Sequence, residues 1–225
     1  MFTCMRESTA GVFGWSPEVW TAIGTLSLAT VTALALLSAP LRRWRDRARL
    51  RMEILKEPPD THMIDMANPL TGVFVTKALY VRVRVNHERG NAAENAELLA
   101  AALWEIDSSG QKKAVSSFLP LNLKWSHVGG VTIRVPRRLF RHCDLGHFQP
   151  VGNQTVFILD TIVQPNPVGT GTAPNVLFPG TTYEIELRLS GDNTKTIAGR
   201  WRISFGSGWS DDEKTMLGRV QITPA

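Results

Sequence analysis

The residues best suited to chemistry lie in one short stretch, "RHCDLGHF", at positions 141–148. His142, Cys143 and His147 are each able to bind zinc, and Asp144 has the side chain that orients an imidazole. A structural zinc site usually needs four ligands with a second pair at a recognisable spacing, and the three other histidines of the chain stand alone. On an extended strand, His142 and Cys143 would point to opposite faces. We therefore expect no metal site here. We also expect no Cys–His nucleophile, because neighbours in sequence lack the geometry of that chemistry.

Two further segments resemble sites in composition only. "GWSDDEKTM" places Asp211, Asp212 and Glu213 in a row beside Trp209, whereas a calcium loop needs alternate positions and a glycine turn. "VGTGTAPN", at 168–175, follows Pro-rich sequence and precedes no expected helix, so it does not match a phosphate-binding loop. We predict a protein that is not an enzyme and that carries no cofactor.

Two surface features have plain interpretations. A basic run, "RVPRRLFRH", has the composition to bind phosphate, acidic loops or a membrane surface, although a charged, solvated sheet edge is the better interpretation. "NQT" at Asn153 matches a glycosylation acceptor, which matters only outside the cytoplasm. The arginines of the basic run are Arg134, Arg137, Arg138 and Arg141.

The net charge of the chain is local. The 225 residues carry a formal charge of +5, and the segment 42–51, with six arginines and one aspartate, accounts for all of it. A nucleic-acid-binding protein needs its basic patch on the folded domain, so we expect no nucleic-acid partner. The two cysteines, Cys4 and Cys143, cannot build a disulfide framework.

A long uncharged span precedes these arginines. Between Glu18 and Arg42 lie 23 residues without a charged side chain, enough at about 1.5 Å per residue to cross a hydrocarbon core of about 30 Å. Ser16 and Pro17 suit an N-cap and a first helical residue. A cleavable signal peptide would need positive charge before a shorter core, and a buried helix would seldom run so long without charge. We predict a transmembrane helix over 17–41, with interfacial anchors at Trp15, Trp20 and Trp44.

The flanking arginines predict the orientation. The flank richer in Lys and Arg stays in the cytoplasm, so the amino terminus is expected outside and the large domain in the cytoplasm. Anionic lipid headgroups are the expected partners of this flank. Its basic residues are Arg42, Arg43, Arg45, Arg47, Arg49 and Arg51.

Two finer features concern the helix. A stripe of small residues at four-residue spacing would let two copies approach closely, although such a stripe also arises by chance in so Ala- and Thr-rich a segment. Beyond the span, the spacing of Leu41, Trp44, Ala48 and Leu55 predicts an amphipathic basic helix reaching about Glu57, unless this flank simply stays solvated. The expected organisation is therefore a tail (1–16), the span (17–41), a basic juxtamembrane helix and linker (42–59) and a domain (60–225). The stripe comprises Thr21, Thr25, Ala29 and Ala33.

After Pro59 the hydrophobic pattern alternates with period two. "ALYVRVRVN" and "TYEIELRLS" place apolar residues on one face and charged residues on the other, as half-buried antiparallel strands do. The segment 92–102 has helical propensity, yet alternation favours a strand from Leu98. Short strands separated by Gly- and Pro-rich turns predict a mainly β domain, an antiparallel β-sandwich or a small barrel. Further strands are expected at 98–107, 118–125, 131–135, 155–163 and 199–205.

Two stretches resemble bacterial immunoglobulin-like domains of the cell-adhesion-related type. They are "YVRVRVNHERGNAAENAELLAAALWEID" and "LFPGTTYEIELRL", and together they cover about a quarter of the domain. The resemblance implies an immunoglobulin-like sandwich that does binding or structural work without catalysis. Such domains are usually extracellular, which conflicts with the orientation above, and the segment 108–180 is longer than their pattern.

These observations predict a single-pass membrane protein whose cytoplasmic sandwich binds a protein partner or a second copy of itself. One alternative is a sensor, a barrel that holds a small anionic ligand such as a nucleotide. Another is an extracytoplasmic adhesion module, if the orientation is inverted.

Overall fold

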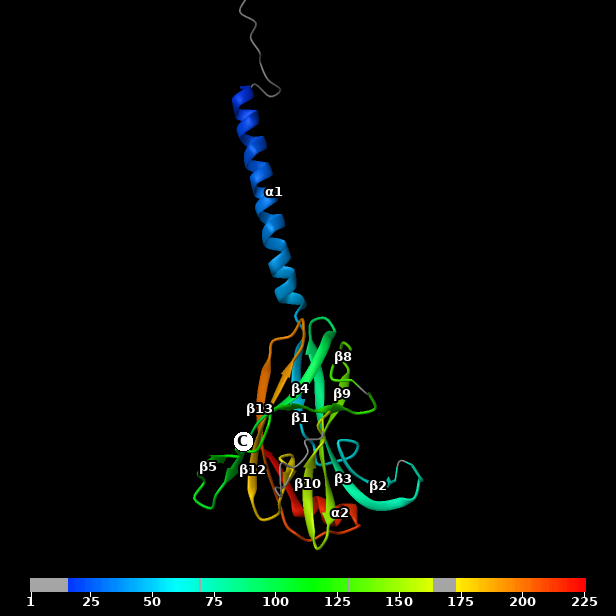
Figure 1. Ribbon diagram of the computed structural model, residues 1–225. Helices are drawn as coiled ribbons and strands as arrows, with labels where there is room; N and C mark the ends of the chain where they lie inside the picture. Colours follow the sequence, from blue (N-terminus) through cyan, green and yellow to red (C-terminus); the bar gives the residue numbers. More distant parts are fainter. Residues whose placement is uncertain (1–15, 69, 129, 164–172) are drawn as a thin grey trace, which may run out of the picture. The chain divides into compact units, whose positions relative to one another are not determined.

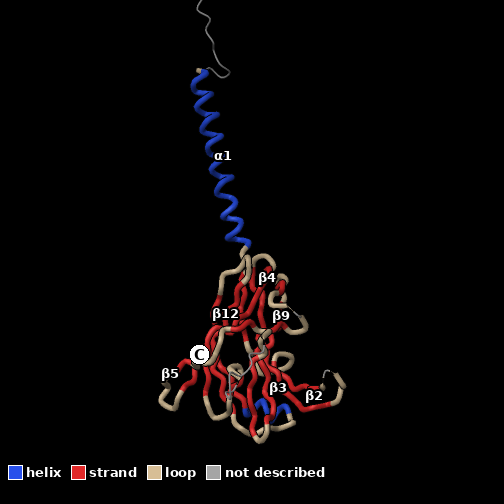
Figure 2. Tube along the Cα trace, viewed as in Figure 1, coloured by secondary structure: helices blue, strands red, loops and turns tan. Residues whose placement is uncertain are grey.

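The computed structural model describes residues 16–68, 70–128, 130–163 and 173–225, with the backbone alone at 39 and 41–44. The chain divides into two compact units, Met1–Asp46 and Arg47–Ala225. The described part of the first unit is helix α1 (Pro17–Asp46), and the second contains the β-strands and a short helix, α2 (Glu213–Arg219) (Figures 1 and 2).

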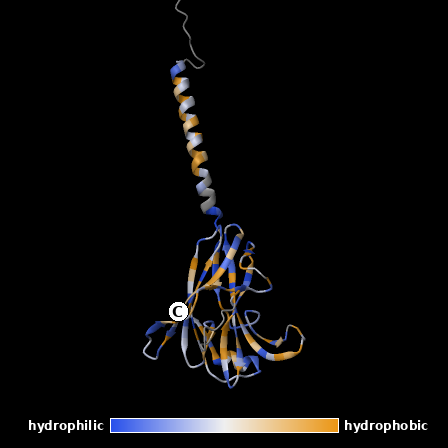
Figure 3. Cartoon of the chain, viewed as in Figure 1, coloured by the Kyte–Doolittle hydropathy of each residue, from blue (hydrophilic) through white to orange (hydrophobic). Residues whose placement is uncertain are grey.

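Helix α1 is long and apolar enough, over Pro17–Ser38, to cross a membrane, and hydrophobic residues recur along this stretch (Figure 3). Every side chain in this stretch is exposed. Its threonine hydroxyls donate to backbone carbonyls four residues earlier, so these polar groups are satisfied inside the helix, as a hydrocarbon environment requires. The four threonines are Thr21, Thr25, Thr30 and Thr32, with donor–acceptor distances of 2.8–2.9 Å.

The helical geometry aligns the small residues of the predicted stripe along one face of α1, where they are exposed. Among the predicted interfacial tryptophans, Trp20 is 41% exposed. Trp15 and the side chains of Trp44, Arg42 and Arg43 lie outside the described residues. The remaining arginines of the basic flank, Arg45, Arg47, Arg49 and Arg51, are all exposed.

The predicted continuation of the helix to Glu57 is wrong. α1 ends at Asp46, and strand β1 (Arg49–Glu53) follows. Residues 49–54 alternate, so that Leu50 and the partly buried Met52 and Ile54 contact the core of the β unit, while the arginines between them face solvent. Burial of this period-two pattern overrides the helical spacing, and the β unit therefore begins near Arg47 rather than at residue 60.

The first sheet has the order β1-β3-β9-β10-β11, with β2 paired to β3 and β7 to β9. All its pairings are antiparallel. The register of β3 against β9 shifts by one residue between Val81 and Arg82. Its strands other than β1 are β2 (Thr61–Ala67), β3 (Phe74–Arg89), β7 (Lys124–Trp125), β9 (Phe140–Val151), β10 (Gln154–Leu159) and β11 (Val176–Leu177).

The second sheet has the order β14-β13-β12-β4-β5, with β6 and β8 also paired to β4. These pairings are antiparallel as well. Its strands are β4 (Ala93–Ile106), β5 (Lys112–Ala114), β6 (Leu121–Asn122), β8 (Ile133–Val135), β12 (Thr182–Ser190), β13 (Ile197–Phe205) and β14 (Val220–Pro224).

The two sheets share one hydrophobic core. Phe148 of the first sheet contacts Phe205 of the second edge to face, with ring centroids 5.0 Å apart. Trp125, Phe148 and Phe157 are fully buried in this core, so large side chains fill the space between the sheets. Met216 of α2 is buried against the same core.

The predicted mainly β, antiparallel class is confirmed, and each predicted strand region contains strand residues. Ala93–Ile106 is a strand throughout, so alternation decides against helical propensity in this segment. Sequence reasoning did not identify β1, β2, β5, β9, β11 or β14. In β9 the alternation of apolar and polar residues is interrupted, because the register against β3 shifts between Asp144 and Gly146. His142 and His147, on either side of the shift, both lie on the outer face although they are five residues apart in the sequence.

Candidate functional site

The structure separates the residues of the "RHCDLGHF" stretch. Cys143 points into the core, where burial raises the pKa of its thiol well above the usual range and keeps it protonated. His142 and Asp144 lie on the opposite face, where His142 contacts Asp60 of the β1–β2 connection and Asp144 pairs with Arg82 of β3. Among the described residues, no three His, Cys, Asp or Glu side chains converge on a position that suits a metal ion.

Asp60 is the centre of the first of these contacts. Its side chain has no exposed surface, and its Oδ1 accepts hydrogen bonds from Arg84 Nη2 at 2.8 Å and Arg84 Nε at 3.2 Å. His142 Nε2 lies 2.7 Å from the same oxygen. Asp60 Oδ2 has no hydrogen-bond partner among the described residues, so the contacts at Oδ1 compensate the buried charge and hold the β1–β2 connection against β3 and β9.

Two similar groups of side-chain contacts, around Asp144 and around His147, lie on the same outer face of the first sheet. Asp144 Oδ1 accepts from Arg82 Nε at 3.0 Å and from Ser126 Oγ at 2.5 Å. His147 contacts Asp160 at 3.1 Å and stacks on Tyr80, with ring centroids 5.0 Å apart. Burial, and then the charges of Asp160 and Asp144, raise the pKa of Tyr80 to about 12. These side chains are paired with one another, which is the arrangement of a structural network.

His62, on β2, gives this face a defined pH dependence. Burial and the charge of Arg82 lower the pKa of His62 below its usual value, although Glu213, Asp144 and a hydrogen bond with the Pro59 backbone oppose the shift. Below about pH 6.5 the unfolded chain then binds more protons at this position than the folded chain, so the β unit loses stability as the pH falls toward the folded-state pKa.

We expect His62→Gln to reduce the difference in unfolding free energy between about pH 7.5 and about pH 5.5. Chemical denaturation of both chains at the two pH values measures this difference, and subtraction removes the contribution of the other histidines. An unchanged pH dependence in the variant would show that His62 titrates alike in both states.

The outer face of the second sheet carries a second ionic network. Glu184 has no exposed side-chain surface and contacts Lys112 Nζ at 2.6 Å and Arg202 Nε at 3.5 Å. Glu186 contacts Arg188 and Arg200, each at 2.8 Å. Burial raises the pKa of Glu184, but the hydrogen bonds and charges of Lys112 and Arg202 outweigh burial and lower it. Hydrogen bonds from Arg188 and Arg200 lower the pKa of Glu186. Both carboxylates are therefore ionised and satisfied at neutral pH.

The acidic run has capping and bridging roles. Asp212 is the N-cap of α2 and accepts from Thr215 N at 2.8 Å. Glu213 accepts from Met63 N at 2.8 Å, and Asp211 from Trp209 Nε1 at 2.8 Å. The arginines of the basic run are exposed, with Arg134 paired to Glu94 at 3.0 Å, and Asn153 is exposed in the turn between β9 and β10.

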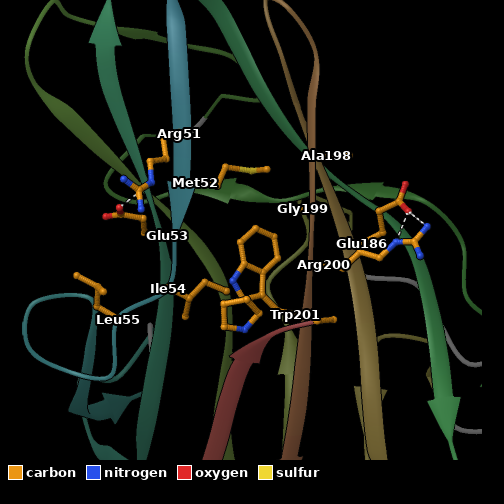
Figure 4. A pocket seen from close by; sticks show the side chains of 12 residues that line it. Arg51, Met52, Glu53, Ile54, Leu55, Glu186, Ala198, Gly199, Arg200 and Trp201 are labelled. Carbon is orange, nitrogen blue, oxygen red and sulfur yellow. Dashed lines mark hydrogen bonds and ion pairs between the residues drawn. The ribbon is translucent and has the colours of Figure 1, made fainter. Parts of the chain in front are cut away.

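A groove of about 690 Å³ lies on the surface of the β unit. It lies between β1 with the two residues after it and β13 with the end of β14 (Figure 4). Trp201 points from β13 toward Met52 and Ile54, and these three side chains supply an apolar surface. Gly199 makes room for the indole, because a Cβ there would lie 2.4 Å from Trp201 Cη2.

Ion pairs flank this apolar surface. Arg51 contacts Glu53 at 3.0 Å on the β1 side, and Arg200 contacts Glu186 at 2.8 Å on the β13 side. The four charged side chains of the lining are therefore paired with one another. The groove is hard to predict from the sequence, because its two walls are about 150 residues apart along the chain. The alternation of the apolar residues Leu50, Met52 and Ile54 is the sequence signal for the wall that β1 forms.

In comparisons with known proteins, no protein-family model, no curated protein and no solved structure matches this chain.

Proposed function

We propose that the chain is a single-pass membrane protein whose β unit binds a protein partner through the groove between β1 and β13. The groove carries the proposal. The acid, base and nucleophile side chains that sequence analysis singled out are paired or buried, whereas the groove is an open concavity with a partly apolar lining, of the kind that binding sites use. This arrangement favours a binding protein over an enzyme.

The anchor in this proposal is α1. An exposed apolar stretch such as Pro17–Ser38 is costly in water and stable in a bilayer. The arginines that follow it favour a cytoplasmic β unit and contact with anionic lipid headgroups. Tethering confines the β unit to a membrane surface, which raises its effective concentration toward other membrane-bound proteins.

The finer fold assignment in this proposal is an immunoglobulin-like sandwich. Two antiparallel sheets with a common core support it, together with the two resembling sequence stretches. The sensor alternative requires an interior ligand cavity, and the buried aromatic side chains between the sheets argue against it. The adhesion alternative requires the β unit outside the cell, which is opposite to the membrane orientation that the arginines after α1 favour.

Photocrosslinking of the membrane-embedded full chain tests the proposal. A benzophenone amino acid replaces Ile54, in the groove, or Leu119, which is 58% exposed and lies between β5 and β6, away from the groove. We expect one defined protein adduct from Ile54, reproduced from Met52 and absent from Leu119. Absence of an adduct from both groove positions, or the same adduct from Leu119, would overturn the proposal.

A further inference from the structure

A pocket of about 550 Å³, separate from the groove, lies at the end of the β unit where the chain enters it. Ala48, the second residue of the unit, donates its N–H to Asn193 O at 3.0 Å, and Asn193 lines the pocket. Figure 1 shows β8, which carries Arg134, at the same end of the unit. The pocket is therefore next to the first residues of the β unit. Its lining includes Asn91, Glu94, Arg134, Pro136, Arg137 and Asn193.

Hydrogen bonds between connections fix the shape of this pocket. The side-chain oxygen of Asn193, in the β12–β13 connection, accepts from Glu94 N at 3.0 Å. The buried ring of His87 links two further connections: its Nε2 lies 2.6 Å from Asn91 O, and its Nδ1 accepts from Arg138 N at 3.2 Å. The β3–β4, β8–β9 and β12–β13 connections are thereby held together, so the pocket is formed in the absence of any ligand.

The β8–β9 connection is a strained turn that presents two arginines. Leu139 N donates to Pro136 O at 3.3 Å and closes the turn, and Arg138, at its third position, has a φ of +57°. A positive φ at this position favours glycine and is costly for a side chain such as arginine. Arg137 and Arg138 are both exposed, and in the described part of the chain no ion pair involves either of them. Strained turns of this kind cluster at binding sites.

The charge at this end of the β unit is positive. The segments that meet here carry seven basic and three acidic side chains, a net charge of +4. Glu94 pairs with Arg134 at 3.0 Å, Asp192 accepts from Asn95 Nδ2 at 2.7 Å, and Glu88 is exposed on β3. The acidic side chains therefore compensate only part of the charge, and the remainder attracts anions. The segments are 47–49, 88–94, 134–138 and 191–195.

Apolar side chains and a short tether favour a lipid surface as the anion. Leu139 is 56% exposed and Phe140 is 44% exposed, directly after the two arginines of the turn. Arginines beside exposed apolar side chains suit a membrane interface, whereas a nucleic-acid backbone offers the apolar groups no partner. Only the five residues 42–46 separate the predicted span from Arg47. Even a fully extended chain of that length keeps Arg47 within about 20 Å of the end of the span.

From these features we infer that this end of the β unit binds anionic lipid headgroups. Arg137, with Arg134 and the side-chain amide of Asn91, takes a headgroup phosphate in the pocket, and Leu139 enters the interface beside it. The planar donor fork of arginine matches the oxygens of a phosphate. This inference rests on the membrane anchor of the proposed function and goes beyond it, because it assigns a second lipid contact to the folded unit itself.

A fluorescent label at position 139 tests the contact. The full chain with Cys4→Ser/Leu139→Cys carries an environment-sensitive nitrobenzoxadiazole label, and the buried Cys143 stays unlabelled. Nanodiscs of phosphatidylcholine, with or without phosphatidylglycerol, contain a nitroxide lipid that quenches the label. We expect quenching to rise at least about threefold with phosphatidylglycerol. The matched label at Leu119→Cys, in the β5–β6 connection, is expected to show no such rise. Equal quenching at position 139 in both nanodiscs would overturn the inference.

Two charge-matched variants test the pocket. Arg134→Gln/Arg137→Gln is expected to abolish the phosphatidylglycerol-dependent rise. Lys113→Gln/Lys214→Gln removes the same charge from exposed positions on β5 and α2 and is expected to retain the rise. Equal loss in the two variants would show that net charge acts without the pocket and would overturn its role.

Two soluble anions distinguish the source of the phosphate. Inorganic phosphate or a short DNA duplex is added to the labelled chain in phosphatidylcholine nanodiscs. We expect neither to change the emission of the label at position 139. A change with inorganic phosphate would mean that the pocket takes free phosphate, and a change with DNA alone would mean that it takes nucleic acid. Either result would overturn the lipid assignment.

The photoadduct at Ile54 separates this inference from the proposed function. If the parent chain gives the adduct but no response to phosphatidylglycerol, the lipid site is wrong and the proposed function stands. If the parent chain gives the response but no adduct from the groove, partner binding at the groove is wrong and the lipid site stands.

Discussion

Asp60→Ala is expected to lower the unfolding free energy of the β unit by about 3 kcal/mol, the low end of the range for breaking a buried ion pair. The substitution leaves the Arg84 guanidinium, whose side chain is 22% exposed, without its carboxylate. It also removes the contact with His142 and leaves a cavity where a fully buried side chain was. The partial exposure of Arg84 keeps the expected loss below the maximum, because solvent screens that charge.

Urea denaturation of the full chain in detergent, followed by far-UV circular dichroism, measures this loss. Asp65→Ala is the matched control, since Asp65 lies on β2 with its side chain exposed. Its substitution is expected to change the unfolding free energy by less than about 0.5 kcal/mol. A similar small change for Asp60→Ala would contradict the role assigned to the buried carboxylate.

The double substitution Ala29→Arg/Ala33→Arg is expected to remove the chain from the membrane. Each arginine near the centre of a transmembrane helix costs about 2.5–3.5 kcal/mol, so the pair costs about 5–7 kcal/mol. Both positions are exposed and lie inside Pro17–Ser38, which has no other charged side chain between residues 19 and 38. Resistance to carbonate extraction, measured on membranes from expressing cells, reports the loss.

Ala29→Leu/Ala33→Leu is the control for this pair. The leucines keep the span apolar, so we expect full membrane retention, and they fill the small-residue stripe. Retention of the arginine variant at the level of the leucine variant would contradict a membrane-spanning α1. Mass measurement of the leucine variant in detergent also tests the stripe, because an unchanged oligomer would show that close helix approach is not needed.

Alternation predicted most of the β unit because successive residues of a half-buried strand point in turn to the core and to solvent, which gives the sequence a hydrophobic period of two. The pattern around Val81–Val85 and Tyr183–Leu189 was sufficient for β3 and β12. It was not sufficient for β1, where arginines follow directly on an apolar helix and a helical spacing competes with the strand spacing. Only the contacts of Leu50 with distant strands distinguish the two.

The candidate site was less predictable than the fold. "RHCDLGHF" drew attention because of its residue types, but the partners that satisfy His142 and His147 are Asp60 and Asp160, and Asp60 lies 82 residues away from His142 along the chain. The groove depends on how β1 and β13, far apart in the sequence, lie side by side. Such long-range pairing has no local sequence signal, so the sequence alone does not show that Trp201 and Gly199 line a groove.

The most direct test of the whole account is cysteine accessibility across the membrane. Cys143 is buried and serves as a silent background, Cys4 precedes α1 in the sequence, and Cys4→Ser/Ser108→Cys places a thiol in the exposed turn after β4. With a membrane-impermeant maleimide, we expect Cys4 to be labelled in intact cells and the thiol at position 108 only after permeabilisation. Labelling of both thiols under the same condition, or of position 108 alone in intact cells, would contradict a spanning α1 with a cytoplasmic β unit.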